Sequence, residues 1–132
     1  MSGPSISDVV GLLRSQVTVS IPVPTASFAG ETVIITGANT GLGREAAKHI
    51  VRLGASKVIL ACRNVSKGEE ARVYIEKETK KTGTTEVWEL DMSNYDSVKR
   101  FARRAEKEER LDAVILNAGI WPNKMEKQEG YE

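Results

Sequence analysis

The chain has 132 residues, of which 40% are hydrophobic and 28% charged, a composition typical of one soluble globular unit. Its net charge of +1 argues against the broad basic surface that binding to nucleic acid or to an anionic membrane requires. The one cysteine, Cys62, has no partner for an internal disulfide and no metal-ligand cluster beside it, which favours a reducing intracellular compartment.

Residues 1–29 are predicted to form a leader and linker. Ser7 and Asp8 can cap a short helix, and Pro22 and Pro24 then favour an extended chain. The apolar side of this helix suits packing across the domain, which we favour because cationic flanks are almost absent, or contact with a membrane or partner. The chain lacks both a secretory signal pattern and an apolar run of roughly 20 residues. We therefore expect a cytoplasmic protein that does not associate with membranes.

The segment 31–54 organises the rest of the chain. The apolar run 32–36 predicts a buried parallel strand, and a turn containing Gly37, Gly41 and Gly43 leads into a helix over 42–53. Free N–H groups at the start of a helix favour an anion, and glycines without a Cβ let a pyrophosphate approach the backbone. The pattern predicts a dinucleotide site; the alternative is that the glycines serve only tight packing of strand and helix.

The glycine spacing over 36–43 is T-G-x-x-x-G-x-G rather than the widespread G-x-G-x-x-G. This octapeptide resembles the cofactor loop of the short-chain dehydrogenase/reductase family. The resemblance implies that the loop binds the cofactor, with contacts from Gly37, Asn39, Thr40, Gly41, Leu42 and Gly43.

The helix over 42–53 is expected to cover the sheet with one apolar face and to end at Gly54. Residues at helical spacing along this face are Leu42, Ala46, Ile50 and Leu53. His49 lies between them without a second potential ligand at metal-binding spacing. We therefore expect a surface histidine and no metal site.

The second strand, 57–61, bears on the choice of cofactor. NAD-selective sites usually place an acidic residue after this strand, roughly 20 residues beyond the glycine turn, to bind the ribose 2′-OH. Here the chain continues with Cys62, Arg63 and, further on, Lys67. Both basic residues can bind a 2′-phosphate, which predicts NADP as the cofactor; the alternative is that Arg63 is a solvated loop residue. Cys62 is interpreted as a small buried filler.

The remaining elements continue the alternation of strands and helices. A capping box from Ser66 to Glu69 starts a helix that ends at Gly83, and a third strand over 86–90 follows. A helix over 95–109 then precedes a fourth strand over 113–116. The inward-facing residues predicted for that helix are Val98, Phe101, Ala102 and Ala105.

Two further segments carry the resemblance. Asp91 follows the third strand at the place where an aspartate of the family contacts the adenine ring, although it can also simply begin a turn capped by Ser93. The segment Asn117, Ala118 and Gly119 resembles the family's N-A-G motif, which steadies the central sheet beside the adenine ribose.

The predicted fold is α/β, a Rossmann-like doubly wound parallel sheet truncated after about four strands, with residues 30–132 forming an incomplete NADP-binding domain. The amino-acid sequence of segments 60–64 and 91–93 most resembles that of two groups in the family, the retinol-dehydrogenase-like members and the fungal members that act in secondary metabolism.

The resemblance implies an NADP-dependent oxidoreductase that transfers a hydride between NADP(H) and a small-molecule carbonyl or alcohol. The family's catalytic Ser and Y-x-x-x-K residues follow the N-A-G segment, so no catalytic residue is expected here. Tyr95 and Lys99 match Y-x-x-x-K, but helical spacing produces such pairs by chance. A non-catalytic nucleotide-binding or partner-binding module is the alternative, and neither nucleic acid nor metal is expected as a partner.

Overall fold

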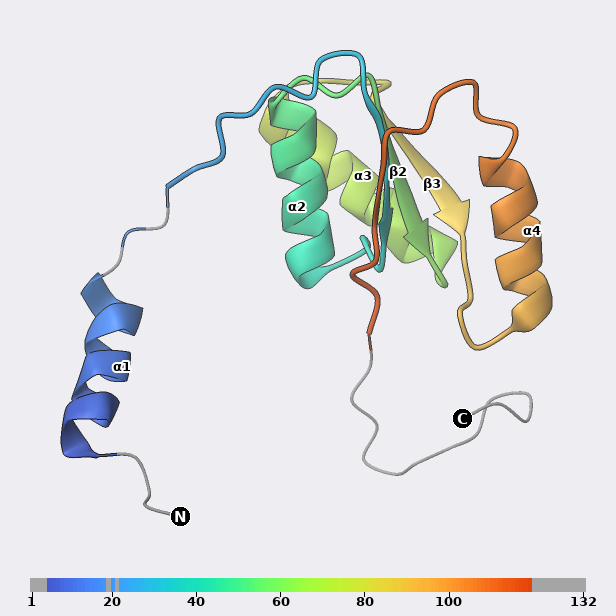
Figure 1. The fold of residues 1–132 in the computed structure, drawn as a ribbon. Helices are drawn as coiled ribbons and strands as arrows, with labels where there is room; N and C mark the ends of the chain where they lie inside the picture. Colours follow the sequence, from blue (N-terminus) through green and yellow to red (C-terminus); the bar gives the residue numbers. More distant parts are fainter. Residues whose placement is uncertain (1–4, 19, 21, 120–132) are drawn as a thin grey trace.

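A computed structural model describes residues 5–18, 20 and 22–119 and shows a parallel four-stranded sheet between helices, in the order β3-β2-β1-β4 (Figure 1). The α/β fold with a doubly wound parallel sheet is thereby confirmed. The elements are α1 (Ile6–Thr18), β1 (Thr32–Thr36), α2 (Gly41–Arg52), β2 (Lys57–Cys62), α3 (Val65–Thr79), β3 (Thr85–Glu89), α4 (Tyr95–Ala105) and β4 (Ala113–Ile115).

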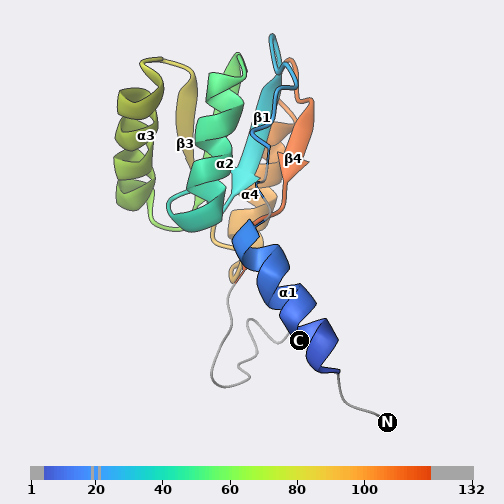
Figure 2. The same ribbon diagram turned by 90° about the vertical axis from the view of Figure 1, so that its left-hand side faces the viewer.

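The register of the sheet brings the carboxyl ends of the strands to one edge. β1 pairs in parallel with β2 from Thr32 and Lys57 to Thr36 and Ala61, and with β4 on its other side. Figure 2 shows β4 at one side of the sheet and β3 at the other. The segments that follow the four strands therefore gather at the same edge, as expected for parallel strands joined by helices.

Apolar side chains point to both faces of the sheet, which explains why the strands are continuous apolar runs. On one face, α2 and α3 pack on a buried cluster; on the other, α4 packs on a second cluster (Figure 1). In this second cluster the ring of Trp88 meets that of Phe101 edge to face, with centroids 5.6 Å apart. The sheet residues buried under α2 and α3 are Val33, Ile35, Val58 and Leu60. Those buried under α4 are Ile34, Ile59, Ala61 and Trp88.

The buried face of α2 differs from the predicted one. Leu42 is 83% exposed and Ala46 only half-buried, whereas Gly43 and Ala47 are buried. The helix is turned because Gly43 lies directly against the glycine turn and Asn117, which selects the face that meets the sheet. The buried residues of α2 are Gly43, Ala47, Lys48, Ile50 and Val51.

The ends of α3 also differ from the prediction. Asn64, not Ser66, is the N-cap, and its side-chain oxygen accepts a hydrogen bond from the backbone N–H of Lys67 at 3.0 Å. The helix ends at Lys80, which takes the left-handed conformation with φ 59°, before Gly83 is reached. The prediction that Ala102 of α4 faces inward is wrong as well, because this residue is exposed.

Helix α1 lies apart from the sheet in Figure 1, and its described side chains are exposed, so it does not pack across the domain. Its N-terminus is a capping box in which the Ser5 N–H donates to the Asp8 carboxylate at 2.9 Å, so the cap precedes the predicted Ser7. Ile6 and Val17 are each 84% exposed. In the part of the chain that the structure describes, no helix is long and apolar enough to cross a bilayer.

A polar group fastens α2 to α3. The buried Lys48 donates a hydrogen bond to the Tyr74 hydroxyl at 3.1 Å and forms an ion pair with Glu45. The Arg44 guanidinium lies over the Tyr74 ring at 4.2 Å from its centroid. These contacts allow a lysine to be buried between helices, since its ammonium is paired with Glu45 and hydrogen-bonded to Tyr74.

Ion pairs close the amino-terminal edge of the sheet. Lys57 at the start of β2 binds the carboxylates of Glu86 and Glu108 at 3.1 and 2.9 Å. Glu86 also accepts a hydrogen bond from the Trp88 indole N–H at 3.0 Å. That bond and the Lys57 ammonium lower the pKa of Glu86 below its ordinary value. The group therefore joins β2, β3 and the segment after α4.

We expect Glu86→Gln to lower the free energy of unfolding at neutral pH. In the acid range, the free energy of unfolding of this variant should change less with pH than that of the unmodified chain. Because the pKa of Glu86 is lowered on folding, its contribution is present above the unfolded value, roughly 4.3, and is lost as the pH falls through the folded value. Urea titrations between pH 3 and 7 would measure this. Glu70→Gln, at an exposed position of α3, is the matched control, and equal pH profiles for the two variants would contradict the prediction.

Candidate cofactor site

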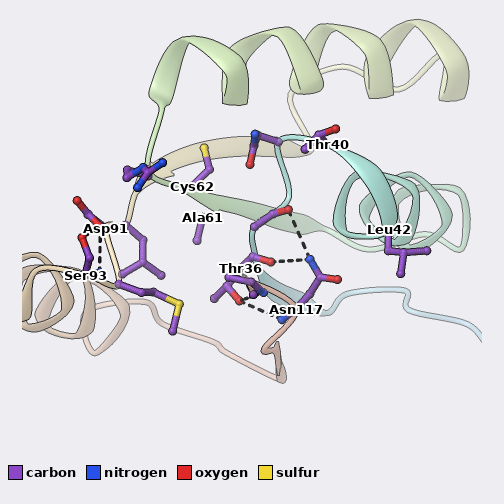
Figure 3. Close-up of a pocket in the computed structure, with 15 residues that line it drawn as sticks. Thr36, Thr40, Leu42, Ala61, Cys62, Asp91, Ser93 and Asn117 are labelled. Atoms are coloured by element: carbon purple, nitrogen blue, oxygen red, sulfur yellow. Dashed lines mark hydrogen bonds between the residues drawn. The ribbon is translucent and has the colours of Figure 1, made fainter. Parts of the chain in front are cut away.

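A cavity of about 640 Å³ opens at the carboxyl edge of the sheet, within the size range of small-molecule sites (Figure 3). The segments that follow all four strands contribute to its wall. The lining residues are Thr36, Gly37, Asn39, Thr40, Leu42, Ala61, Cys62, Arg63, Leu90, Asp91, Met92, Ser93, Asn117, Ala118 and Gly119.

The turn after β1 has no room for side chains at two of its glycines. Gly37 has φ +67°, and a Cβ built on it would lie 2.9 Å from the Ala118 Cα atom. A Cβ on Gly43 would lie 2.6 Å from both the Gly37 carbonyl oxygen and the Asn117 Nδ2 atom. The close approach of the turn, the start of α2 and the segment after β4 thus requires glycine at both positions.

Hydrogen bonds from Asn117 hold this turn in place (Figure 3). Its backbone N–H donates to the Thr36 Oγ1 atom at 3.0 Å, and its side-chain Nδ2 donates to the Thr36 carbonyl, also at 3.0 Å. The N–H of Ala118 donates to the same Thr36 hydroxyl at 3.0 Å. The end of β4 is therefore fastened to the end of β1, beside the cavity.

The start of α2 provides backbone donors at the cavity wall. Thr40, the N-cap residue, makes no side-chain hydrogen bond to the first turn of the helix. Thr40 and Leu42 both line the cavity. Uncapped N–H groups and the positive end of the helix dipole favour an anionic group such as a pyrophosphate at this place.

The end of β2 places a cation at the cavity and keeps its neighbouring thiol buried. Arg63 is exposed and lines the cavity. The Cys62 thiol is 3% exposed and donates to the Asn64 carbonyl at 3.4 Å. Burial raises the pKa of Cys62, which disfavours the thiolate and supports the interpretation of a packing residue. Lys67 does not line the cavity; it lies in the first turn of α3.

Asp91 begins a turn at the wall of the cavity. One carboxylate oxygen accepts hydrogen bonds from the Ser93 hydroxyl at 2.7 Å and from the Ser93 N–H at 3.0 Å (Figure 3). These bonds and, more weakly, the charge of Arg63 lower the pKa of Asp91. The aspartate thus stays ionised, begins the turn into α4 and lines the cavity. Contact with an adenine ring stays a prediction.

The structure brings most of the predicted cofactor residues together. Those that line the cavity are Gly37, Asn39, Thr40, Leu42, Arg63, Asp91, Asn117, Ala118 and Gly119, whereas Gly41, Gly43 and Lys67 do not. Six residues that line the cavity were not predicted from the sequence: Thr36, Ala61, Cys62, Leu90, Met92 and Ser93. Their position near a strand end was the only signal that could have identified them.

Tyr95 and Lys99 lie at the start of α4. Lys99 forms an ion pair with Asp96 at 2.7 Å, and its ammonium lies 4.8 Å from the centroid of the Tyr95 ring. Neither is among the described residues that line the cavity. Within the described residues, no group of three or more His, Cys, Asp or Glu side chains could hold a metal ion.

We expect Gly43→Ala to weaken dinucleotide binding at least tenfold, because its Cβ would displace the Gly37 carbonyl or the Asn117 side chain that shapes the turn. Titration of intrinsic fluorescence with NADPH would measure the dissociation constant. Gly11→Ala, in a helix with no atom near the added Cβ, is the matched control. Unchanged affinity in Gly43→Ala would mean that the turn tolerates the side chain or serves packing alone.

Comparison with known sequences places the chain among oxidoreductases. The short chain dehydrogenase family profile matches residues 31–131. A short chain dehydrogenase/reductase of Cryptosporiopsis sp. (strain 8999) is 50% identical over 125 residues, covering 93% of this chain and 39% of the relative. A short chain dehydrogenase of Gibberella zeae is 44% identical over 133 residues, covering 100% of this chain and 38% of the relative. The chain thus spans about two fifths of the length of these relatives.

Comparison with solved structures leads to the same family. A short chain dehydrogenase of Escherichia coli CFT073 complexed with NADPH has a TM-score of 0.61 at 35% identity, over 74% of this chain and 41% of that protein. Menthone neomenthol reductase from Mentha piperita has a TM-score of 0.61 at 32% identity, over 70% of this chain and 33% of that protein. With the glycine turn, the parallel sheet and the N-A-G segment in the same order, the chain belongs to the short chain dehydrogenase family.

Proposed function

We propose that this chain is the NADP(H)-binding part of a short-chain oxidoreductase that transfers a hydride between NADP(H) and a small-molecule carbonyl or alcohol. The observation that carries the cofactor choice is Arg63, which is exposed at the end of β2 and lines the cavity. No acidic residue occurs between Cys62 and Gly68 to bind a ribose 2′-OH. A guanidinium there suits a 2′-phosphate instead.

The residues present fit such a dinucleotide. The uncapped start of α2 supplies N–H donors for a pyrophosphate. Gly37 and Gly43 let the turn that leads into this helix lie directly against the segment after β4. Arg63 would bind the 2′-phosphate and Lys67 would add a second positive charge. When bound, the nicotinamide supplies or accepts the hydride. The described residues act by binding and orienting the cofactor.

The comparisons support the proposal without fixing the cofactor or the substrate. The Escherichia coli neighbour was solved with NADPH, and the curated relatives named above are fungal dehydrogenases. This agrees with the predicted resemblance to the fungal branch, and we include a role in secondary metabolism and a cytoplasmic location in the proposal. The carbonyl or alcohol substrate would be selected by parts of longer family members that this chain does not span.

If Arg63 binds the 2′-phosphate, NADPH should bind more tightly than NADH, and Arg63→Ala should remove most of that preference. A charge-assisted hydrogen bond contributes about 1.5–3 kcal/mol, so the affinity for NADPH should fall roughly ten- to hundredfold while that for NADH stays unchanged. Isothermal titration with both cofactors would measure this. Arg52→Ala, at an exposed position of α2, is the control. Equal affinity of the unmodified protein for both cofactors would refute the choice of NADP.

A non-catalytic nucleotide-binding module is the second candidate, favoured by the position of Tyr95 and Lys99 outside the residues that line the cavity. Hydride transfer to a carbonyl needs a proton donor roughly 2.6–3.2 Å from the reacting oxygen. We therefore expect no NADPH oxidation by this chain with a panel of aldehydes and ketones, and no effect of Tyr95→Phe on NADPH binding. Turnover that Tyr95→Phe abolishes would instead make these two residues the active site.

A further inference from the structure

The first turn of α3 packs closely on two side chains of the sheet through a glycine. Gly68 is buried there, and a Cβ built on it would lie 2.5 Å from the Val87 Cγ1 atom and 2.6 Å from the Cys62 Sγ atom. Val87 belongs to β3 and Cys62 to β2, so two neighbouring strands limit the approach of the helix. Glycine is therefore required for this seating of α3.

The seating of α3 is coupled to the loop that carries Arg63. Only Arg63 and Asn64 separate the end of β2 from the start of α3. The Asn64 carbonyl accepts hydrogen bonds from the Cys62 thiol at 3.4 Å and from the Gly68 N–H at 3.0 Å. The Asn64 side chain in turn caps the helix through the Lys67 N–H. Strand end, loop and first helical turn thus form one unit.

We propose that Gly68 is a positioning residue for cofactor selectivity: the absence of its side chain seats α3 so that Arg63 reaches the 2′-phosphate of NADP(H). The inference rests on the proposed function of Arg63 and adds a residue that does not line the cavity.

An added Cβ would force a displacement that the loop transmits. Carbon atoms in good contact lie about 3.5–4.0 Å apart, so α3 would have to move by roughly 1 Å unless both obstructing side chains moved. Val87 is branched at Cβ and therefore stiff. Hydrogen bonds from Arg63 to a phosphate tolerate little change in distance, so a displaced loop would lose them. The glycine turn proposed to bind the pyrophosphate lies on other elements and would not be displaced. The preference for NADPH should fall while binding of NADH persists.

The test compares Gly68→Ala with the unmodified chain by titration with NADPH and with NADH. We expect the dissociation constant for NADPH to rise roughly tenfold and that for NADH to change less than about twofold. Gly11→Ala is the matched control, because its added Cβ meets no atom within 4 Å. If the substitution acted only on the stability of the helix, it would weaken the binding of NADPH and of NADH to the same extent. A change in helix propensity does not depend on which of the two cofactors binds.

A rescue variant tests the steric cause. In a Val87→Ala background, which removes the nearer obstructing atom and keeps the Cys62 bond to the loop, adding Gly68→Ala should reduce the ratio of the two affinities less than it does in the unmodified chain. Should Gly68→Ala alone fail to fold, Gly68→Ala/Val87→Ala, in which the Cys62 sulfur is the remaining obstruction, should show a partly reduced preference for NADPH. The unmodified preference in a folded Gly68→Ala variant would refute the inference.

The outcomes separate the inference from the proposal on which it rests. If the unmodified chain binds NADPH and NADH equally, the role of Arg63 fails and the inference fails with it. If Arg63→Ala removes the preference but Gly68→Ala keeps it, or lowers both affinities in parallel, only the role of Gly68 is overturned.

Discussion

The candidate cofactor site depends on the hydrogen bonds that the hydroxyl and the backbone carbonyl of Thr36 accept. Thr36 is 3% exposed. Its hydroxyl accepts hydrogen bonds from the backbone N–H groups of Asn117 and Ala118, and its backbone carbonyl accepts one from the Asn117 side-chain amide. An unmade hydrogen bond would cost free energy in such a buried place, so the segment after β4 is held against the glycine turn. Gly37 and Gly43 then permit the contact that these bonds impose.

The two edges of the sheet are built for different purposes. At the amino-terminal edge, Lys57 joins Glu86 and Glu108, so charges there are paired within the protein. At the carboxyl edge, Arg63 is exposed at the cavity wall, and the Asp91 carboxylate accepts a hydrogen bond from Ser93 in the turn that it begins. The exposed guanidinium at the second edge suits an anionic ligand, whereas the ion pairs at the first edge contribute to stability.

Local patterns allowed much of the fold and the strand ends of the site to be predicted. Apolar runs gave the strands, and the glycine spacing gave the turn, because both patterns act over a few residues. The rotation of α2 could not be predicted, since it depends on the contact of Gly43 with Asn117, far away in the chain. Asn64 and Ser66 are both good N-caps, and local sequence does not choose between them. Met92 was missed because only the folded loop brings it to the cavity.

The bond between Asn117 and Thr36 spans 81 positions of the chain. Closing so long a loop costs conformational entropy before any contact compensates for it, and such pairings form slowly. β1 can pair with β2 once residue 62 has left the ribosome, but it can pair with β4 only once residue 115 has done so. During translation the loop that carries Arg63 can therefore form before the glycine turn is fastened, and the cavity is completed only when β4 has paired with β1.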